Sequence, residues 1–216
     1  MQIGVLQSVQ VGTPHRYGTL DVWETSFFRT PGTQPRWLYT THLDGNRQAD
    51  TENHGQLNQA VLLYAAAHYP LWQSELHQPE IGPGGFGENF TIQGLSEETA
   101  CIGDTYAIGD AQIQVTGPRY PCWKIERRWG ITGLTDRVAK TGRTGWYCRV
   151  VREAMIEPGT IVTLVERLYP QWTVALTNDF GHFRNKDIAT AQALATCPLL
   201  NEFWQKLVVR RAMRKE

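Results

Sequence analysis

The sequence lacks the cysteine and histidine spacings that build disulfide scaffolds and zinc sites. Its 216 residues include four cysteines and six histidines, with no Cys-x-x-Cys or His-x-x-x-His pair. Disulfide scaffolds are shorter and denser in cysteine, and structural zinc sites usually draw on such pairs. We therefore expect reduced thiols, and any functional cysteine is expected to act without a second cysteine as its partner.

An excess of charge and a long apolar run are also missing. Lys plus Arg equals Asp plus Glu at 21 each, so no overall charge draws the chain to nucleic acid or to a membrane. No run of about 18 apolar residues and no secretory signal pattern is found. We expect a soluble, cytoplasmic protein whose anion binding comes from a local site, and a homodimer stays open.

The segment from Gly117 to Arg128 carries the clearest chemical signal. It places Cys122 directly after Pro121, beyond a strand-like run, and each proline fixes its own φ and biases the residue before it to extended backbone. Nearby cations favour the thiolate, which attacks carbon and binds metals; they are Arg119, Lys124, Arg127 and Arg128. Cys122 is predicted to be reactive or metal-binding, whereas the other three cysteines fit the usual buried residue.

A second unusual stretch, residues 81–92, has four glycines within six positions. Successive amides in such a loop can form a nest that holds an anion, and Glu88 and Asn89 add polar groups. The spacing matches neither a phosphate loop nor a dinucleotide fingerprint, and a plain turn between strands is the alternative. Two weaker candidates are Arg143, which enters a strand between glycines, and His54, which a solvated loop position explains equally well.

The pattern of short β-branched and aromatic runs predicts an α+β fold that is mainly β. The predicted strands are 3–9, 22–28, 37–41, 90–92, 146–152, 160–166 and a hairpin within 101–116 that turns at Gly109. The predicted helices are 59–68, 71–76, 123–129, 134–140, 173–180, 186–194 and 199–213. We expect a strand domain over residues 1–167 and a docked three-helix appendage over residues 168–216.

Taken in order, five motifs resemble those of the MOSC domain family, and within it the YiiM branch of the 6-N-hydroxylaminopurine reductase type. They are Gly85–Thr91, Gly94–Leu95, Cys101–Asp104, Pro118–Lys124 and Gly142–Tyr147. The Asp50-x-x-x-His54-Gly55 loop and the helical tail match that branch as well. One departure is Gln56, which stands where the family often has a second glycine.

The resemblance implies a β-barrel-like domain that carries the molybdenum cofactor, a pterin dithiolene with a phosphate. Cys122 would bind the metal and be the catalytic residue. The residues expected to hold the cofactor are His54, Gly55, Phe86, Gly87, Glu88, Asn89, Arg119, Lys124 and Arg143. The chemistry of the side chains agrees, because a thiolate suits a sulfur-ligated metal and cations suit a phosphate.

The activity that the resemblance implies is reduction of N-hydroxylated compounds, base analogues such as 6-N-hydroxylaminopurine among them. No flavin, haem or iron–sulfur motif is visible in the sequence, so a separate flavin or iron–sulfur protein is expected to donate electrons. An alternative is a carrier that holds the cofactor or a persulfide on Cys122 without turnover. A hydrolase with Cys122 as nucleophile and His54 as base ranks last.

Overall fold

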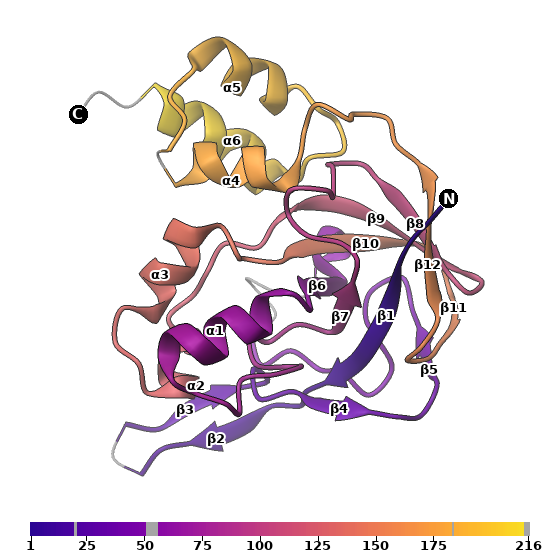
Figure 1. Cartoon of the computed structure of the whole chain (residues 1–216), viewed down its shortest axis with the longest axis vertical. Helices are drawn as coiled ribbons and strands as arrows, with labels where there is room; N and C mark the ends of the chain where they lie inside the picture. Colours follow the sequence, from indigo (N-terminus) through magenta and orange to yellow (C-terminus); the bar gives the residue numbers. More distant parts are fainter. Residues whose placement is uncertain (20, 51–55, 183, 214–216) are drawn as a thin grey trace.

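The protein is organised around a closed β-barrel (Figure 1), seen in a computed structural model that describes residues 1–19, 21–50, 56–182 and 184–213. Seven strands form the barrel: β1 (Gln2–Val11), β6 (Val61–Ala65), β7 (Phe90–Gln93), β8 (Thr105–Ile108), β9 (Ala111–Pro118), β10 (Trp146–Arg152) and β12 (Ile161–Glu166). Their order is β12-β8-β9-β10-β6-β7-β1, and a β1–β12 pairing closes the ring. Closure gives each of these seven strands a neighbour on both sides, and the short strand over residues 30–32 pairs with β1 outside the ring.

Most neighbouring strands of the barrel are antiparallel, and β6 and β7 form a parallel pair. Short strands extend the structure around it: β2 (His15–Tyr17), β3 (Trp23–Thr25), β4 (Thr30–Gly32), β5 (Arg36–Leu38) and β11 (Ala154–Ile156). The expected hairpin is confirmed, since β8 pairs with β9 across the turn at Gly109. The mainly β fold class is likewise confirmed.

The helix expected over residues 59–68 is wrong. A short 3-10 turn (Leu57–Gln59) leads into β6, and helix α1 begins only at His68. All five residues of β6 are buried, with Leu63 facing the barrel core and Tyr64 facing a second cluster. A strand covered on both faces is continuously apolar, which hides the alternation that marks a strand.

The other helices follow the sequence pattern closely. They are α1 (His68–Leu76), α2 (Lys124–Trp129), α3 (Leu134–Thr141), α4 (Val174–Gly181), α5 (Ile188–Ala195) and α6 (Glu202–Ala212). Pro70 lies in the first turn of α1, where backbone amides have no acceptor within the helix, so the lack of an amide hydrogen costs no helical hydrogen bond. None of the described helices is both long and apolar enough to cross a membrane.

Helices α4, α5 and α6 pack together beyond one end of the barrel (Figure 1) and share its core. Phe180, Leu194 and Trp204 belong to the same buried cluster as the barrel strands. The Trp204 indole donates to the carbonyl of Pro118 at 2.7 Å, and Asn201 donates through its backbone and side-chain nitrogens to the carbonyl of Thr116. The expected docking is confirmed, and the boundary at residue 167 stays a prediction.

A second buried cluster fills the space between the barrel and helices α1, α2 and α3. Its larger members are Trp72 of α1, Phe86 of the glycine-rich loop and Ile125 of α2, and Cys122 packs against its edge. The segment that follows β9 is therefore held from two directions, by α6 at Pro118 and by this cluster beyond Cys122.

Candidate functional site

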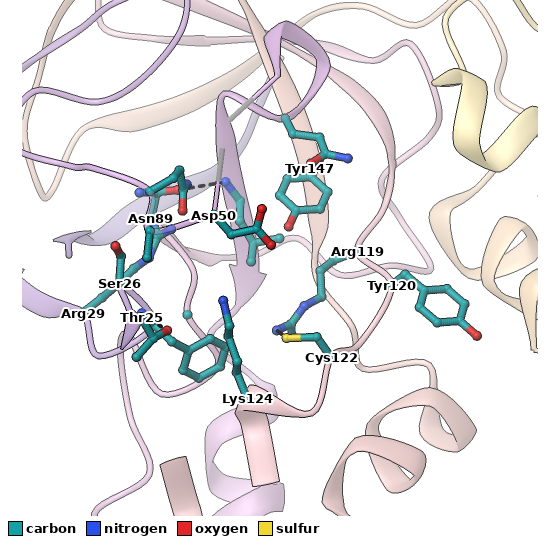
Figure 2. A pocket seen from close by; sticks show the side chains of 16 residues that line it. Thr25, Ser26, Arg29, Asp50, Asn89, Arg119, Tyr120, Cys122, Lys124 and Tyr147 are labelled. Carbon is teal, nitrogen blue, oxygen red and sulfur yellow. Dashed lines mark hydrogen bonds between the residues drawn. The ribbon is translucent and has the colours of Figure 1, made fainter. Parts of the chain in front are cut away.

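A cavity lies where the end of β9, the start of α2 and the loops before β4 and β6 meet (Figure 2). It has a volume of about 50 Å³ and is lined by sixteen residues. Beside it lies a wider cleft of about 370 Å³. The two spaces share six lining residues, which are Asp50, Gln59, Tyr120, Cys122, Lys124 and Tyr147. The thiol of Cys122 thus borders both the inner cavity and its wider approach.

The backbone around Cys122 is fixed by hydrogen bonds. Its carbonyl accepts from the Thr135 hydroxyl and from the Ile125 amide, each at 3.2 Å. Its side chain is partly buried, and Arg119 Nη2 lies 3.9 Å from its Sγ. Cys101 and Cys148 are buried, and burial raises the pKa of both thiols. The structure keeps those two as buried thiols and places Cys122 beside a cation.

Two buried arginines line the inner cavity. Arg29 is 8% exposed and Arg119 is 3% exposed. Within the described residues, Arg29 Nε and Nη1 and Arg119 Nη1 have no hydrogen-bond partner. Burial lowers the pKa of Arg29 to about 10, with Arg119 acting in the same direction and Tyr147 and Glu88 opposing it. Both guanidinium groups carry donors that an anion in this cavity would satisfy.

Of the other predicted cations, Lys124 lines the cavity and extends into it in Figure 2. Arg127 lies over the rings of Trp23 and Trp123 and pairs with Asp21. Arg128 donates to the carbonyl of Phe27. The positive charge at the site therefore comes from Arg119 and Lys124, as expected, and from Arg29, which lies far away in the sequence.

The expected anion nest in the glycine-rich loop is wrong, because its amides are already bonded within the chain. Glu88 is fully buried and accepts from the amides of Gly84 and Phe86. The amides of Gly85 and Gly87 donate to backbone carbonyls. The hydroxyl of Tyr69 also donates to the Glu88 carboxylate. The carboxylate of Glu88 occupies the position that the prediction gave to an external anion.

The remaining predicted cofactor residues divide into two groups. Gly87 and Asn89 line the cavity, although the Asn89 amide also bonds the amide of Leu62 and the carbonyl of Gln10. Phe86 is instead buried against Tyr64, with ring centroids 4.8 Å apart.

Arg143 also lies away from the lining of both spaces. Its guanidinium lies 3.8 Å from the ring centre of Trp72 and donates to Glu75 at 2.8 and 3.0 Å. A direct contact of Phe86, Glu88 or Arg143 with a ligand in this cavity is therefore unsupported. His54 and Gly55 lie outside the described residues.

Several lining residues are absent from the sequence prediction, and three of them carry polar groups that bear on ligand binding: Arg29, Gln59 and Tyr147. Arg29 and Gln59 have no local signal, because their importance comes from burial with open polar atoms, which only the fold reveals. Tyr147 ends a motif that was noted, yet its role was not assigned. Burial raises the pKa of Tyr147, while the nearby Arg119 cation opposes the rise. The phenol of Tyr147 extends into the cavity (Figure 2). The raised pKa keeps it protonated at neutral pH.

Comparisons with known proteins agree on one family. Residues 50–163 match the model of the MOSC domain. The chain is 34% identical to YflK of Bacillus subtilis, an uncharacterized protein, over 88% of this chain and 86% of YflK. It is 30% identical to a protein of Gibberella moniliformis named "Reductase", over 93% of this chain but only 36% of that protein.

A solved structure supports the same grouping. The crystal structure of YiiM from Geobacillus stearothermophilus superposes with a TM-score of 0.81 at 28% identity, covering 97% of this chain and 99% of that one. The similarity therefore includes the C-terminal helices as well as the barrel.

Proposed function

The chain belongs to the MOSC domain family, and from that premise we propose that it is a molybdenum-cofactor-dependent reductase of N-hydroxylated compounds, base analogues such as 6-N-hydroxylaminopurine among them. The observation that carries the proposal is a partly buried thiol that lines one cavity together with two buried arginines whose donors are open. Such a set suits a ligand that combines a soft metal with negative charge.

The side chains of the cavity fit such a cofactor in two respects. Cys122 offers one sulfur ligand, and within the described residues no three His, Cys, Asp or Glu side chains gather into a metal site of their own. A metal at Cys122 would bring further ligands with it, as a dithiolene does. The open N–H groups of Arg29 and Arg119 match the anionic oxygens or sulfurs of such a group.

We assign the residues as follows. The Cys122 thiolate would bind the metal, with Arg119 beside the sulfur stabilising its negative charge. Arg29, Arg119 and Lys124 would hold the anionic part of the cofactor. Gly87 has no side chain at the cavity wall, and an added Cβ would meet the ring of Phe27 at 2.7 Å. Its φ of +77° also favours glycine.

The overall reaction consumes two electrons and two protons for each substrate. The N–O bond of the hydroxylamine breaks, the nitrogen becomes an amine, and the oxygen leaves as water. When bound, the cofactor supplies the two-electron chemistry, and the chain positions the substrate and limits access of water. Each turnover leaves the site oxidised, so a reductant has to restore it. We expect a separate flavin or iron–sulfur protein to donate these electrons.

The proposal is tested by turnover of 6-N-hydroxylaminopurine with a chemical electron donor, using protein expressed with an intact cofactor supply. We expect activity in the parent chain and none in Cys122→Ala. Cys197→Ala is the matched control, since Cys197 is a free thiol buried among the C-terminal helices. Bound molybdenum without turnover would instead indicate a carrier, and equal turnover in Cys122→Ala would contradict the assignment of the ligand.

A further inference from the structure

Large aromatic side chains stand exposed around the wider cleft that leads to Cys122. Tyr120 is 41% exposed, Trp123 is 51% exposed and Phe203 is 49% exposed, and all three line this cleft. Exposed apolar side chains scattered singly are ordinary, whereas a group of rings around one opening marks a binding surface. The opening leads to the proposed reaction site, so the surface is suited to substrate.

Phe203 is held in a defined position by the packing of α6. Its ring meets Tyr120 edge to face, with centroids 5.8 Å apart and an interplanar angle of 77°. The next residue, Trp204, is buried and hydrogen-bonds to the carbonyl of Pro118. The helix that carries Phe203 is therefore fixed to the segment that carries Cys122. A ring held this way offers a flat face at little cost in conformational entropy.

Polar groups suited to the edge of a heteroaromatic ring lie beside these rings. Gln59 lines both the inner cavity and the cleft, and its Oε1 is buried with no partner in the described part of the chain. Gln59 and Phe203 also border a neighbouring hollow of about 360 Å³, together with Asn58 and Asn201. A carboxamide offers a donor and an acceptor side by side, which pairs with the edge of a nucleobase.

We propose that Phe203, with Tyr120 and Trp123, forms a stacking subsite that selects planar heteroaromatic substrates, and that Gln59 contacts the polar edge of the ring. This inference rests on the proposed function and names the part of the chain that sets its specificity. Phe203 lies outside residues 50–163, which match the family model. The C-terminal helices thereby contribute a wall of the substrate site, in addition to packing on the barrel. Aromatic stacking with a polar edge contact is the general way in which proteins hold a separate base.

The test measures binding and turnover separately on the full chain. Binding of adenine, the amine that reduction of 6-N-hydroxylaminopurine yields, is followed by titration calorimetry, with cyclohexylamine as a non-planar probe. Removing one stacking ring in Phe203→Ala is expected to weaken adenine binding about 10-fold. Phe203→Tyr keeps the ring and is expected to bind as the parent does. Ile188→Ala is the matched control, because Ile188 is 46% exposed on α5 and lines neither space.

Turnover supplies the second readout. In the cofactor-loaded chain, Phe203→Ala is expected to raise KM for 6-N-hydroxylaminopurine about 10-fold with kcat nearly unchanged, and to leave KM for N-methylhydroxylamine unchanged. Adenine binding that is absent in the parent, or undiminished in Phe203→Ala, would overturn the subsite. If adenine binding depends on Phe203 but the loaded chain shows no turnover, the subsite is supported. The missing turnover would then contradict only the proposed reaction.

Discussion

The glycine-rich loop and the neighbouring Cys122 cavity both contain buried charged side chains, but they differ in whether those side chains have hydrogen-bond partners within the chain. In the loop, the Glu88 carboxylate accepts from two backbone amides and the Tyr69 hydroxyl, so its charge is satisfied within the chain. In the cavity, Arg29 and Arg119 are buried with N–H groups that lack partners among the described residues. A buried charge that the chain satisfies stabilises the fold, whereas one left open is prepared for a ligand.

The largest expected effect lies in the loop and concerns stability. Glu88→Ala leaves the amides of Gly84 and Phe86 buried without an acceptor, and is expected to lower the free energy of unfolding by about 3–5 kcal/mol. Chemical denaturation measures this change. Glu98→Ala removes an exposed carboxylate ten residues further along the chain and is expected to change stability by less than about 0.5 kcal/mol. A loss under about 1 kcal/mol in Glu88→Ala would remove the contrast between the two regions.

Substitution of a buried charged residue in the cavity is expected to change the free energy of unfolding in the opposite direction. Arg29→Met removes a desolvated cation, so the cofactor-free chain is expected to be as stable as the parent or about 1–2 kcal/mol more stable. Its affinity for inorganic phosphate is expected to fall about 10- to 100-fold, because a charge-assisted donor is lost. Arg16→Met, at an exposed arginine, is the control. Denaturation and calorimetric titration check the two parts, and marked destabilisation with unchanged phosphate affinity would show that Arg29 is structural.

The smallest effect concerns His182, whose Nε2 is buried and unpartnered in the described structure but lies outside the lining of both spaces. Burial lowers its pKa from 6.5 to about 4, with Arg184 and Arg211 adding to the shift and Asp179 opposing it. Above pH 6.5 the ring is neutral whether the chain is folded or unfolded. Between pH 6.5 and 4 only the unfolded chain takes up the proton, so stability falls as the pH falls through this window.

After allowance for solvent screening, we expect His182 to contribute about 1–2 kcal/mol to that loss at pH 4. His182→Phe keeps a ring against Tyr120 and Trp204 and removes the titration. Denaturation midpoints of the parent and the variant, measured between pH 7 and pH 4, should therefore diverge as the pH falls. Parallel curves would show that the open nitrogen of His182 has no energetic consequence.

Local sequence patterns predict some of the residues that line the cavity but not the others. Cys122, Arg119 and Lys124 lie within six residues of one another, so a single segment revealed them. Arg29 joins them only because distant strands meet, and no pattern near it signals a buried cation. Glu88 was assigned to the ligand because sequence shows a carboxylate next to glycines but not which way it turns. The partner of a buried polar group is decided by tertiary packing.

The fold shows the same division. Turn residues at Gly109 correctly predict the hairpin, and apolar periodicity correctly predicts the three C-terminal helices. The sequence of β6 predicts a helix instead of the observed strand, because Leu and Ala favour helices and because burial of both faces removes the alternation. Helix propensity therefore gave the wrong prediction at a strand whose residues are divided between the two buried clusters.

The most direct test of the open cavity is the molybdenum content of the purified chain. Metal per chain is measured after gel filtration for the parent, Cys122→Ala and Cys197→Ala, all expressed with the same cofactor supply. We predict that the parent and Cys197→Ala retain molybdenum and that Cys122→Ala loses it while remaining folded. Equal molybdenum in all three proteins would contradict the assignment of Cys122 as the metal ligand.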